Sequence, residues 1–155
     1  MNRYRTHLES PLGGLAVIAS DEAILAIEFD ALPEPDDARG HPLLERARTQ
    51  LEEYFAGRRT TFDLPLAPDG SDWQRCVWRA LQTIPFAETT SYAEIAERVD
   101  RPKSARAVGA ANSKNPIAIV IPCHRVIGAD GSLTGYAGGM DKKRWLLTHE
   151  RSVSA

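Results

Sequence analysis

Ile117-Ala118-Ile119-Val120-Ile121-Pro122-Cys123-His124-Arg125 is the most informative stretch of this 155-residue chain. Its uninterrupted apolar run, 117–121, predicts a fully buried strand, and the proline that follows ends the strand because it has no N–H to donate. A cysteine would then lie at the mouth of a rigid element, beside a histidine. Because a neighbouring imidazole lowers a thiol pKa and the thiolate is the nucleophile, Cys123 is a candidate catalytic group. A purely structural cysteine at a strand end is the alternative that the Cys-His pair alone would favour.

The composition is that of an ordinary soluble globular protein, with 43% hydrophobic and 26% charged residues. No run of about 18 apolar residues predicts a membrane span, and residues 1–6 lack the apolar core of a signal peptide. The two cysteines, far apart in sequence, make no disulfide framework. We therefore expect a cytoplasmic protein in a reducing compartment, without membrane association.

The charge is divided unevenly between the two halves of the chain. Residues 1–68 carry 7 Lys+Arg and 12 Asp+Glu, a net charge of −5, whereas residues 69–155 carry 12 and 9, a net charge of +3. A basic C-terminal half favours a polyanionic partner such as a nucleic acid. An excess of three charges also arises by chance, so the charge alone does not identify DNA.

The hydrophobic pattern divides the chain into an N-terminal α/β domain, residues 1–68, and a C-terminal domain, residues 69–155. The boundary falls at a polar turn, Ala67-Pro68-Asp69-Gly70. In the first domain we expect a small sheet with one helix and an exposed loop over 32–42. The expected elements are a hairpin of strands Leu15–Ala19 and Ile24–Phe29, a helix Leu43–Phe55 capped at Gly57, and a short strand Thr61–Leu66.

The second domain is expected to be mostly helical. Its first predicted helix is capped by Asp72 and ends at Pro85, and Cys76 is assigned to its buried face as a small hydrophobic residue. The expected apolar face comprises Trp73, Cys76, Val77, Ala80, Leu81 and Ile84. A last helix over about 141–148 would turn Trp145 and Leu146 inward and Lys142, Lys143 and Arg144 outward.

Between these helices the pattern predicts a helix-turn-helix motif. Ser91-Tyr92-Ala93-Glu94 is a capping-box pattern, in which hydroxyl and carboxylate satisfy the free amides at a helix start. After a break at Asp100-Arg101-Pro102, Ser104 is the expected cap of a second helix running to about Ser113. That helix is rich in alanine and glycine, so it could approach another surface closely or simply pack against the first helix.

Further motifs flank the Cys-His pair in a fixed order: Asn115-Pro116 before it, and Val126-Ile127-Gly128 and Gly135-Tyr136-Ala137-Gly138-Gly139 after it. Together they resemble the alkylguanine-DNA alkyltransferases, the methylated-DNA–protein-cysteine methyltransferases. The resemblance covers nearly the whole chain and is densest from Trp73 to Glu150. It implies an α/β fold, with a small ribonuclease-H-like N-terminal domain and a mostly helical C-terminal domain that carries the helix-turn-helix.

The activity that the resemblance implies is direct-reversal DNA repair. The alkyl group of 6-O-alkylguanine, chiefly methyl, moves to the protein's own Cys123 after the base has been flipped out of the duplex. A thioether is not hydrolysed as a thioester is, so each molecule acts once and inactivates itself. The expected partner is double-stranded DNA containing alkylated guanine, and we expect a monomer that needs no cofactor.

The resemblance also assigns roles to residues. Cys123 is the acceptor, His124 and Glu150 form a relay that works through water, Asn115 braces the turn, and Tyr92 donates to N3 of the flipped base. Arg106 would intercalate in the gap left by that base. The implied DNA-binding residues are Ser91, Lys103, Ala105, Arg106, Ala107, Ala110 and Lys114. The implied base pocket comprises Tyr92, Val126, Tyr136, Ala137 and Gly138.

Bare sequence leaves plainer alternatives for several of these residues. Glu150 would read as an exposed residue near a frayed terminus, and Arg106 as a surface arginine or a phosphate contact. Ala137 stands where many relatives have serine, which removes one hydroxyl contact near the guanine oxygen. His7, His41 and His149 lie far apart and no cysteine stands near them at ligand spacing, so no metal site is expected.

Three other protein classes share parts of this pattern. A cysteine hydrolase or acyltransferase would use Cys123 and His124 but would turn over. An alkyltransferase-like protein would bind the lesion but lack the acceptor cysteine. A helix-turn-helix regulator would need no reactive thiol. The intact mass of the protein after mixing with methylated oligonucleotide separates all three from a methyltransferase.

Overall fold

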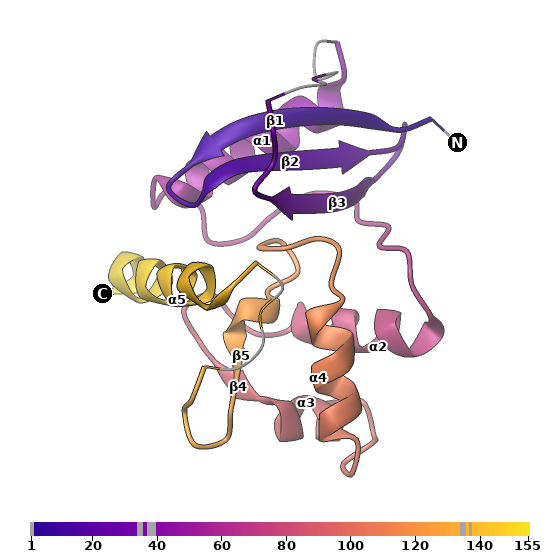
Figure 1. Ribbon diagram of the computed structural model, residues 1–155, viewed down its shortest axis with the longest axis vertical. Helices are drawn as coiled ribbons and strands as arrows, with labels where there is room; N and C mark the ends of the chain where they lie inside the picture. The colour runs from indigo at the N-terminus through magenta and orange to yellow at the C-terminus, as the bar shows by residue number, and fades with distance from the viewer. Residues whose placement is uncertain (1, 34–35, 37–39, 134–135, 137) are drawn as a thin grey trace. The chain divides into compact units, whose positions relative to one another are not determined.

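The computed structural model describes every residue except 1, 34–35, 37–39, 134–135 and 137. The chain forms two compact units (Figure 1). The first contains Met1–Asp69 together with Pro116–Ala118, and the second contains Gly70–Asn115 and Ile119–Ala155. The first is a sheet with a helix and the second is mostly helical, which confirms the fold class expected from the sequence.

The first unit is built on a three-stranded antiparallel sheet. Its strands β1 (Tyr4–Ser10), β2 (Gly13–Ala19) and β3 (Ile24–Phe29) lie in the order β1-β2-β3. β2 is the central strand and is the most deeply buried, because α1 (Pro42–Phe55) covers it together with β1. β2 and β3 confirm the predicted hairpin. The sequence analysis missed β1, whose polar residues give only a weak alternation.

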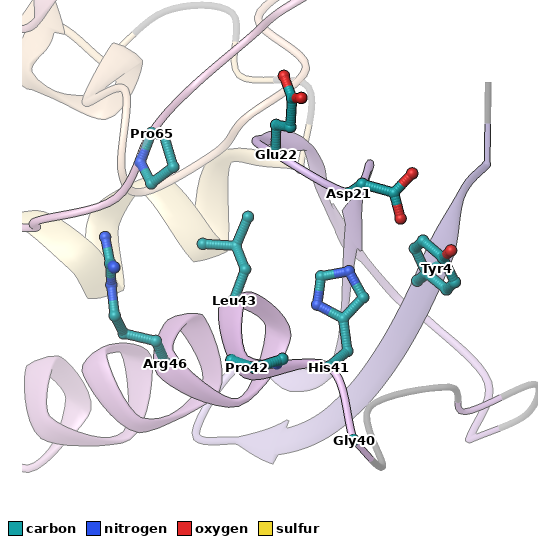
Figure 2. Close-up of a pocket in the computed structure, with 9 residues that line it drawn as sticks. All are labelled: Tyr4, Asp21, Glu22, Gly40, His41, Pro42, Leu43, Arg46 and Pro65. Atoms are coloured by element: carbon teal, nitrogen blue, oxygen red, sulfur yellow. The ribbon is translucent and has the colours of Figure 1, made fainter.

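The helix α1 begins with a histidine in place of the usual serine, threonine or aspartate cap. The His41 Nδ1 accepts from the Leu44 N–H at 3.3 Å, and its Nε2 lies 3.2 Å from the Ser20 carbonyl oxygen. A neutral ring with its proton on Nε2 satisfies both contacts. Figure 2 shows that Tyr4 and Asp21 lie near this ring beside a cavity of about 580 Å³. His41 of the helix cap thus forms part of the wall of this cavity.

Two predicted strands are absent. Residues 61–66 make only an isolated parallel bridge, between Leu66 and Ile24. The run 117–121 is wrong as a strand as well: Ile117 makes one bridge to Ile27, and the chain then turns, with Ile119 at a positive φ of 72°. The run is largely buried, as predicted, but burial alone does not distinguish a strand from a buried turn.

The second unit packs three helices around a buried tryptophan. The helices α2 (Asp72–Leu81), α3 (Tyr92–Arg98) and α4 (Ala105–Ser113) contact one another, and α3 and α4 are the pair predicted for the helix-turn-helix. The Trp78 indole N–H donates to the Ala111 carbonyl oxygen at 2.8 Å, which ties α2 to α4. The remaining elements are β4 (Thr90–Ser91), which pairs in parallel with β5 (Val126–Ile127), the short 3-10 helix η1 (Cys123–Arg125), and α5 (Met140–Ser154).

The starts of α2, α3 and α4 each differ in part from prediction. The cap of α2 is Ser71, not Asp72: Ser71 and Gln74 form a complete capping box, and Asp72 is the first helical residue. Ser91 caps α3 as predicted, with its hydroxyl accepting from the Glu94 N–H at 3.1 Å, but the Glu94 carboxylate bonds Arg98 at 3.3 Å and does not complete the predicted capping box. Ser104 occupies the cap position of α4, but its side chain makes no capping hydrogen bond.

We expect Ser71→Ala to lower the free energy of unfolding by about 1 kcal/mol, because the first turn of α2 loses a capping partner. Ser104→Ala is the matched control at a cap position without a side-chain bond, and its change should be within a few tenths of a kcal/mol. Urea unfolding of the three proteins measures the difference. Equal losses in both variants would contradict the capping assignment.

Candidate active site

Cys123 lies at the start of η1, in a turn that follows Pro122, not at the end of a strand. Its side chain is buried, with 4% of the residue exposed. The Asn115 amide Nδ2 donates both to Cys123 Sγ at 3.1 Å and to the Ile121 carbonyl oxygen at 2.8 Å. Asn112 Nδ2 lies 3.4 Å from the Cys123 carbonyl oxygen. Two asparagines at the end of α4 therefore hold the cysteine turn in place.

His124 and Glu150 meet inside the second unit. His124 Nε2 lies 2.7 Å from Glu150 Oε2, and neither side chain is exposed. The helix α5 continues to Ser154, beyond the end predicted near Thr148, and this extension places Glu150 on a buried helix face. The exposed, frayed position that bare sequence favoured for Glu150 is therefore wrong. The structure brings the two predicted relay residues together.

The carboxylate of Glu150 is held by more than the histidine. Arg125 Nε donates to Oε1 at 2.9 Å, Arg125 Nη2 donates to Oε2 at 3.1 Å, and the Ala87 N–H reaches Oε1 at 3.2 Å. Burial raises the pKa of Glu150, but the hydrogen bonds and charges of His124 and Arg125 outweigh it, and the pKa lies well below the ordinary value. Glu150 is thus an anion at neutral pH.

Burial shifts the pKa values of both His124 and Cys123 so that the neutral form of each side chain is favoured. It lowers the pKa of His124, against the raising effect of Glu150. It raises the pKa of Cys123 to about 11, and hydrogen bonds from Asn115 and Tyr136 and the charge of Lys143 offset only part of that rise. Both shifts favour the uncharged forms, a thiol and a neutral imidazole.

Lys143 points into the unit, whereas the sequence analysis placed it on the outer face of the last helix. It is fully buried, and its Nζ donates to the Val126 carbonyl oxygen at 2.7 Å. Burial lowers the pKa of Lys143 to about 8, and the neighbouring Cys123 acts in the opposite direction. The basic run of α5 therefore has one inward and two outer members, which a charge pattern alone does not separate.

The predicted base pocket is only partly within the described residues. Tyr136 is buried, and burial raises its pKa well above the ordinary value. Val126 begins β5 directly after η1, and Gly138 is half-buried before α5. Gly135 and Ala137, which the resemblance placed in this pocket or its loop, lie outside the described residues. Among the described members, Tyr136 acts on the pKa of Cys123, and the Val126 carbonyl oxygen accepts from Lys143 Nζ.

α4 has two distinct faces. Its buried face consists of Val108, Ala111 and Asn112. The predicted DNA-binding residues lie on or near the other face: Lys103, Arg106, Ala107, Ala110 and Lys114 are exposed, and Ser91 and Ala105 are half-buried. The Tyr92 ring packs beside Gly109, where a Cβ would lie 3.7 Å from the ring. The exposed stripe is thus small residues flanked by cations.

The sequence analysis missed Arg125 and Lys143 as parts of this site. Both are charged side chains within a buried cluster, and Arg125 stood inside the decisive motif without receiving a role. Cys76 is half-buried, not a core residue, because the buried face of α2 consists of Val77, Trp78 and Leu81. The predicted and the observed buried faces of α2 share Val77 and Leu81, but the observed face is turned toward Trp78 and away from Cys76.

The described part of the chain contains no candidate metal centre and no candidate membrane span. No three or more histidine, cysteine, aspartate or glutamate side chains gather there in an arrangement that could hold a metal ion. None of the described helices combines the length and apolarity needed to cross a bilayer.

Both units match domains of one known protein family. Residues 3–68 match the ribonuclease-like domain of 6-O-methylguanine DNA methyltransferase, and residues 72–152 match its DNA-binding domain. The methylated-DNA–protein-cysteine methyltransferase of Methanosarcina acetivorans is 46% identical over 96% of this chain and 99% of its own length. The protein of the same name from Mycolicibacterium paratuberculosis is 51% identical over 99% and 95%.

Solved structures give the same result. The 6-O-methylguanine methyltransferase of Mycobacterium tuberculosis has a TM-score of 0.88 at 43% identity, covering 99% of this chain and 96% of that one. The structure of Mycobacterium tuberculosis OGT in complex with DNA has a TM-score of 0.87 at 44% identity, covering 96% and 93%. These matches confirm the resemblance read from the motifs. The chain belongs to the 6-O-methylguanine DNA methyltransferase family.

Proposed function

We propose that this chain repairs alkylated DNA directly, by transferring the alkyl group of 6-O-alkylguanine, chiefly methyl, to Sγ of Cys123. The observation that carries the proposal is a buried cysteine braced by Asn115 and followed by a histidine bonded to a buried glutamate, in a chain of this family. All of these residues belong to the second unit. We therefore assign residues 69–155 as the DNA-binding and active-site domain.

The transfer is a displacement at the alkyl carbon. The Cys123 sulfur forms the new C–S bond as the bond between that carbon and the guanine oxygen breaks, and the bonding electrons pass to the base. His124 takes the thiol proton through a water molecule, and Glu150 stabilises the imidazolium that forms. Tyr92 donates to the ring nitrogen N3, so the guanine need not leave as a full anion. The base takes up one proton in place of its alkyl group, and the imidazolium gives back the one that it took from the thiol. The products are intact guanine, an S-alkylcysteine and a neutral His124.

Burial opposes ionisation of the Cys123 thiol, whereas Asn115 and Lys143 favour negative charge on its sulfur. With a pKa of about 11, Cys123 is almost entirely a thiol in the free protein at neutral pH. The developing negative charge on sulfur would meet the Asn115 amide and the charge of Lys143. Because these groups act in a buried site, each is worth more there than in water. We assign Lys143 to this stabilisation.

The partner is double-stranded DNA that contains the alkylated base. A base within a duplex is out of reach of a buried sulfur, so the nucleotide must rotate out of the stack at a cost of a few kcal/mol. We assign the exposed face of α4 to the DNA, with Arg106 filling the gap and Lys103 and Lys114 contacting phosphates. A relative bound to DNA supports this partner.

Excess methylated duplex should convert the protein to a single species heavier by one methyl group, with the added mass on Cys123. The thioether is stable in water, so repair should stop at one lesion per protein molecule. Intact mass and peptide mapping check this, and Cys123→Ser, which lacks the soft nucleophile, should bind DNA without gaining mass. Repair well beyond one lesion per molecule, or methylation shared with Cys76, would contradict the proposal.

Arg106→Ala should slow repair of methylated duplex by more than about tenfold while leaving transfer from a free alkylguanine within about twofold, because a free base needs no extrusion. Arg58→Ala removes an exposed arginine from the first unit and is the matched control. Single-turnover labelling of both substrates gives the two rates. If Arg106→Ala slows both equally, Arg106 is only a surface charge.

Glu150→Gln should slow alkyl transfer and also lower stability by about 3 kcal/mol, because Arg125 keeps a buried charge without its anion. Since the pKa of Glu150 is depressed, its contribution to stability is complete above the ordinary value of 4.5 and is lost as the pH falls below it. The stability gap between wild type and variant should therefore shrink in acid. Urea unfolding across pH measures this, and a gap that stays constant would place Glu150 outside the ion pair.

A further inference from the structure

The first unit contains none of the residues that we assign to the transfer, yet it includes three residues from the C-terminal half of the chain. Pro116–Ala118 forms one compact unit with Met1–Asp69, whereas Asn115 and Ile119 on either side belong to the second unit. The chain therefore leaves the second unit directly after Asn115, whose amide bonds the Cys123 sulfur, and returns to it before the cysteine turn.

The strand β3 holds this segment. The Ile27 N–H donates to the Pro116 carbonyl oxygen at 2.9 Å, and Ile27 forms a parallel bridge with Ile117. Both isoleucines are buried. On its other edge β3 pairs with β2, where Val17 lies across from Ile27. The segment is thus joined to the sheet as a short continuation beyond β3.

This contact restrains Asn115 from its C-terminal side. The Asn115 N–H donates to the Asn112 carbonyl oxygen at 3.3 Å, so α4 holds the residue from the N-terminal side. The proline that follows further limits the backbone of Asn115. Since one peptide bond separates Asn115 from the anchored Pro116, the direction of the Asn115 side chain depends on both α4 and β3.

The turn after the segment also depends on outside support. Ile119 has a positive φ of 72°, a conformation that a β-branched residue rarely adopts. Such a conformation persists only where the surrounding contacts enforce it. Ile117 is fixed to β3 on one side, and the Cys123 N–H donates to the Ile121 carbonyl oxygen at 2.8 Å on the other. The contact with β3 therefore helps to hold the cysteine turn in its shape.

We propose that Ile27 of β3 is a positioning residue for the transfer. Its N–H fixes the Pro116 carbonyl, and the backbone held in this way aims the Asn115 amide at Cys123 Sγ. The inference rests on the proposed function, in which Cys123 is the alkyl acceptor. It gives the first unit a part in the reaction, although every group that we assign to the chemistry belongs to the second unit.

Replacing Ile27 by its α-hydroxy acid tests this, because the resulting ester lacks the backbone N–H and keeps the side chain. Ile24 is the matched control: its N–H donates from the same strand to the Pro65 carbonyl oxygen at 2.8 Å. Both residues are buried isoleucines bonded to a proline carbonyl, but Pro65 does not adjoin a residue of the site. Urea unfolding should show similar losses of stability in the two ester proteins.

The first measurement is the NMR spectrum of the Asn115 side-chain amide, whose proton resonances should shift in the Ile27 ester and stay in place in the Ile24 ester. The second is single-turnover transfer from a free alkylguanine. We expect the maximal rate to fall about tenfold in the Ile27 ester and to stay within about twofold in the Ile24 ester, because a small misplacement of a site group is costly. The concentration for half-maximal rate should be unchanged in both.

Combining each ester with Asn115→Ala tests whether the effect passes through Asn115. In that background the Ile27 ester should slow transfer by no more than about twofold further, because the amide that it aims is absent. A full tenfold loss there would overturn the proposal, as would equal slowing of transfer by the two esters in the wild-type background.

A measurement without esters covers the case in which the Ile27 ester does not fold. Coupling between two contacts is reciprocal, so Asn115→Ala should raise the hydrogen-exchange rate of the Ile27 N–H by about tenfold. The Ile24 N–H in the same protein is the control and should keep its rate. An unchanged rate at Ile27, or an equal rise at both amides, would overturn the proposal.

The NMR and hydrogen-exchange measurements do not depend on alkyl transfer. If wild-type protein takes no alkyl group while both measurements give the expected results, only the proposed function is wrong. If wild-type protein transfers the alkyl group and the Ile27 ester matches the Ile24 ester in rate and in the Asn115 resonances, only the role of Ile27 is wrong.

Discussion

The buried carboxylate of Glu150 is the group on which the active site depends. It joins three segments that are distant in sequence: η1 through His124 and Arg125, the loop before β4 through the Ala87 N–H, and α5, which carries it. Removing a carboxylate from water is costly, and only several close partners offset that cost. The same contacts that make burial tolerable therefore fix the geometry of the histidine.

Burial of Cys123 has two opposite consequences. It encloses the sulfur in a site where hydrogen bonds and charges act strongly, and it also opposes ionisation, raising the pKa to about 11. Asn115 and Lys143 offset part of this cost through contacts built into the ends of α4 and α5. Burial and these two contacts therefore act on the ionisation of Cys123 in opposite directions.

α4 links the proposed DNA-facing surface to the nucleophile. Its exposed residues are small or basic, while its buried face reaches Trp78 through the Ala111 carbonyl and the cysteine turn through Asn112. Because a helix is stiff over this length, the position of its outer face and that of the cysteine turn are set together. The helix has alanines on both sides. Ala107 and Ala110 are exposed, where small residues suit close approach to another surface, and Ala111 is buried.

Sequence alone determined the family and the fold class and indicated the acceptor that we propose, because these rest on an ordered set of motifs and on local patterns. The strands β2 and β3, the helix α1, the Ser91 cap and the two helices of the helix-turn-helix all follow from spacing and capping residues close together in the chain. Serine and aspartate are both good helix caps, so the sequence did not distinguish Ser71, the observed cap of α2, from its neighbour Asp72.

Only the tertiary structure decided which charged residues are inside. Lys143 belongs to a run that looks like solvated charge, Arg125 received no role from the sequence, and Glu150 lies where a frayed end was the simpler expectation, yet all three are buried. Arg125 and Glu150 offset each other's charge, and Lys143 donates to the Val126 carbonyl oxygen. These contacts exist only when distant segments meet. The turn at 117–121 has the same explanation: a periodicity reports that residues are buried, whereas the contacts of the folded chain decide whether the backbone there extends or turns.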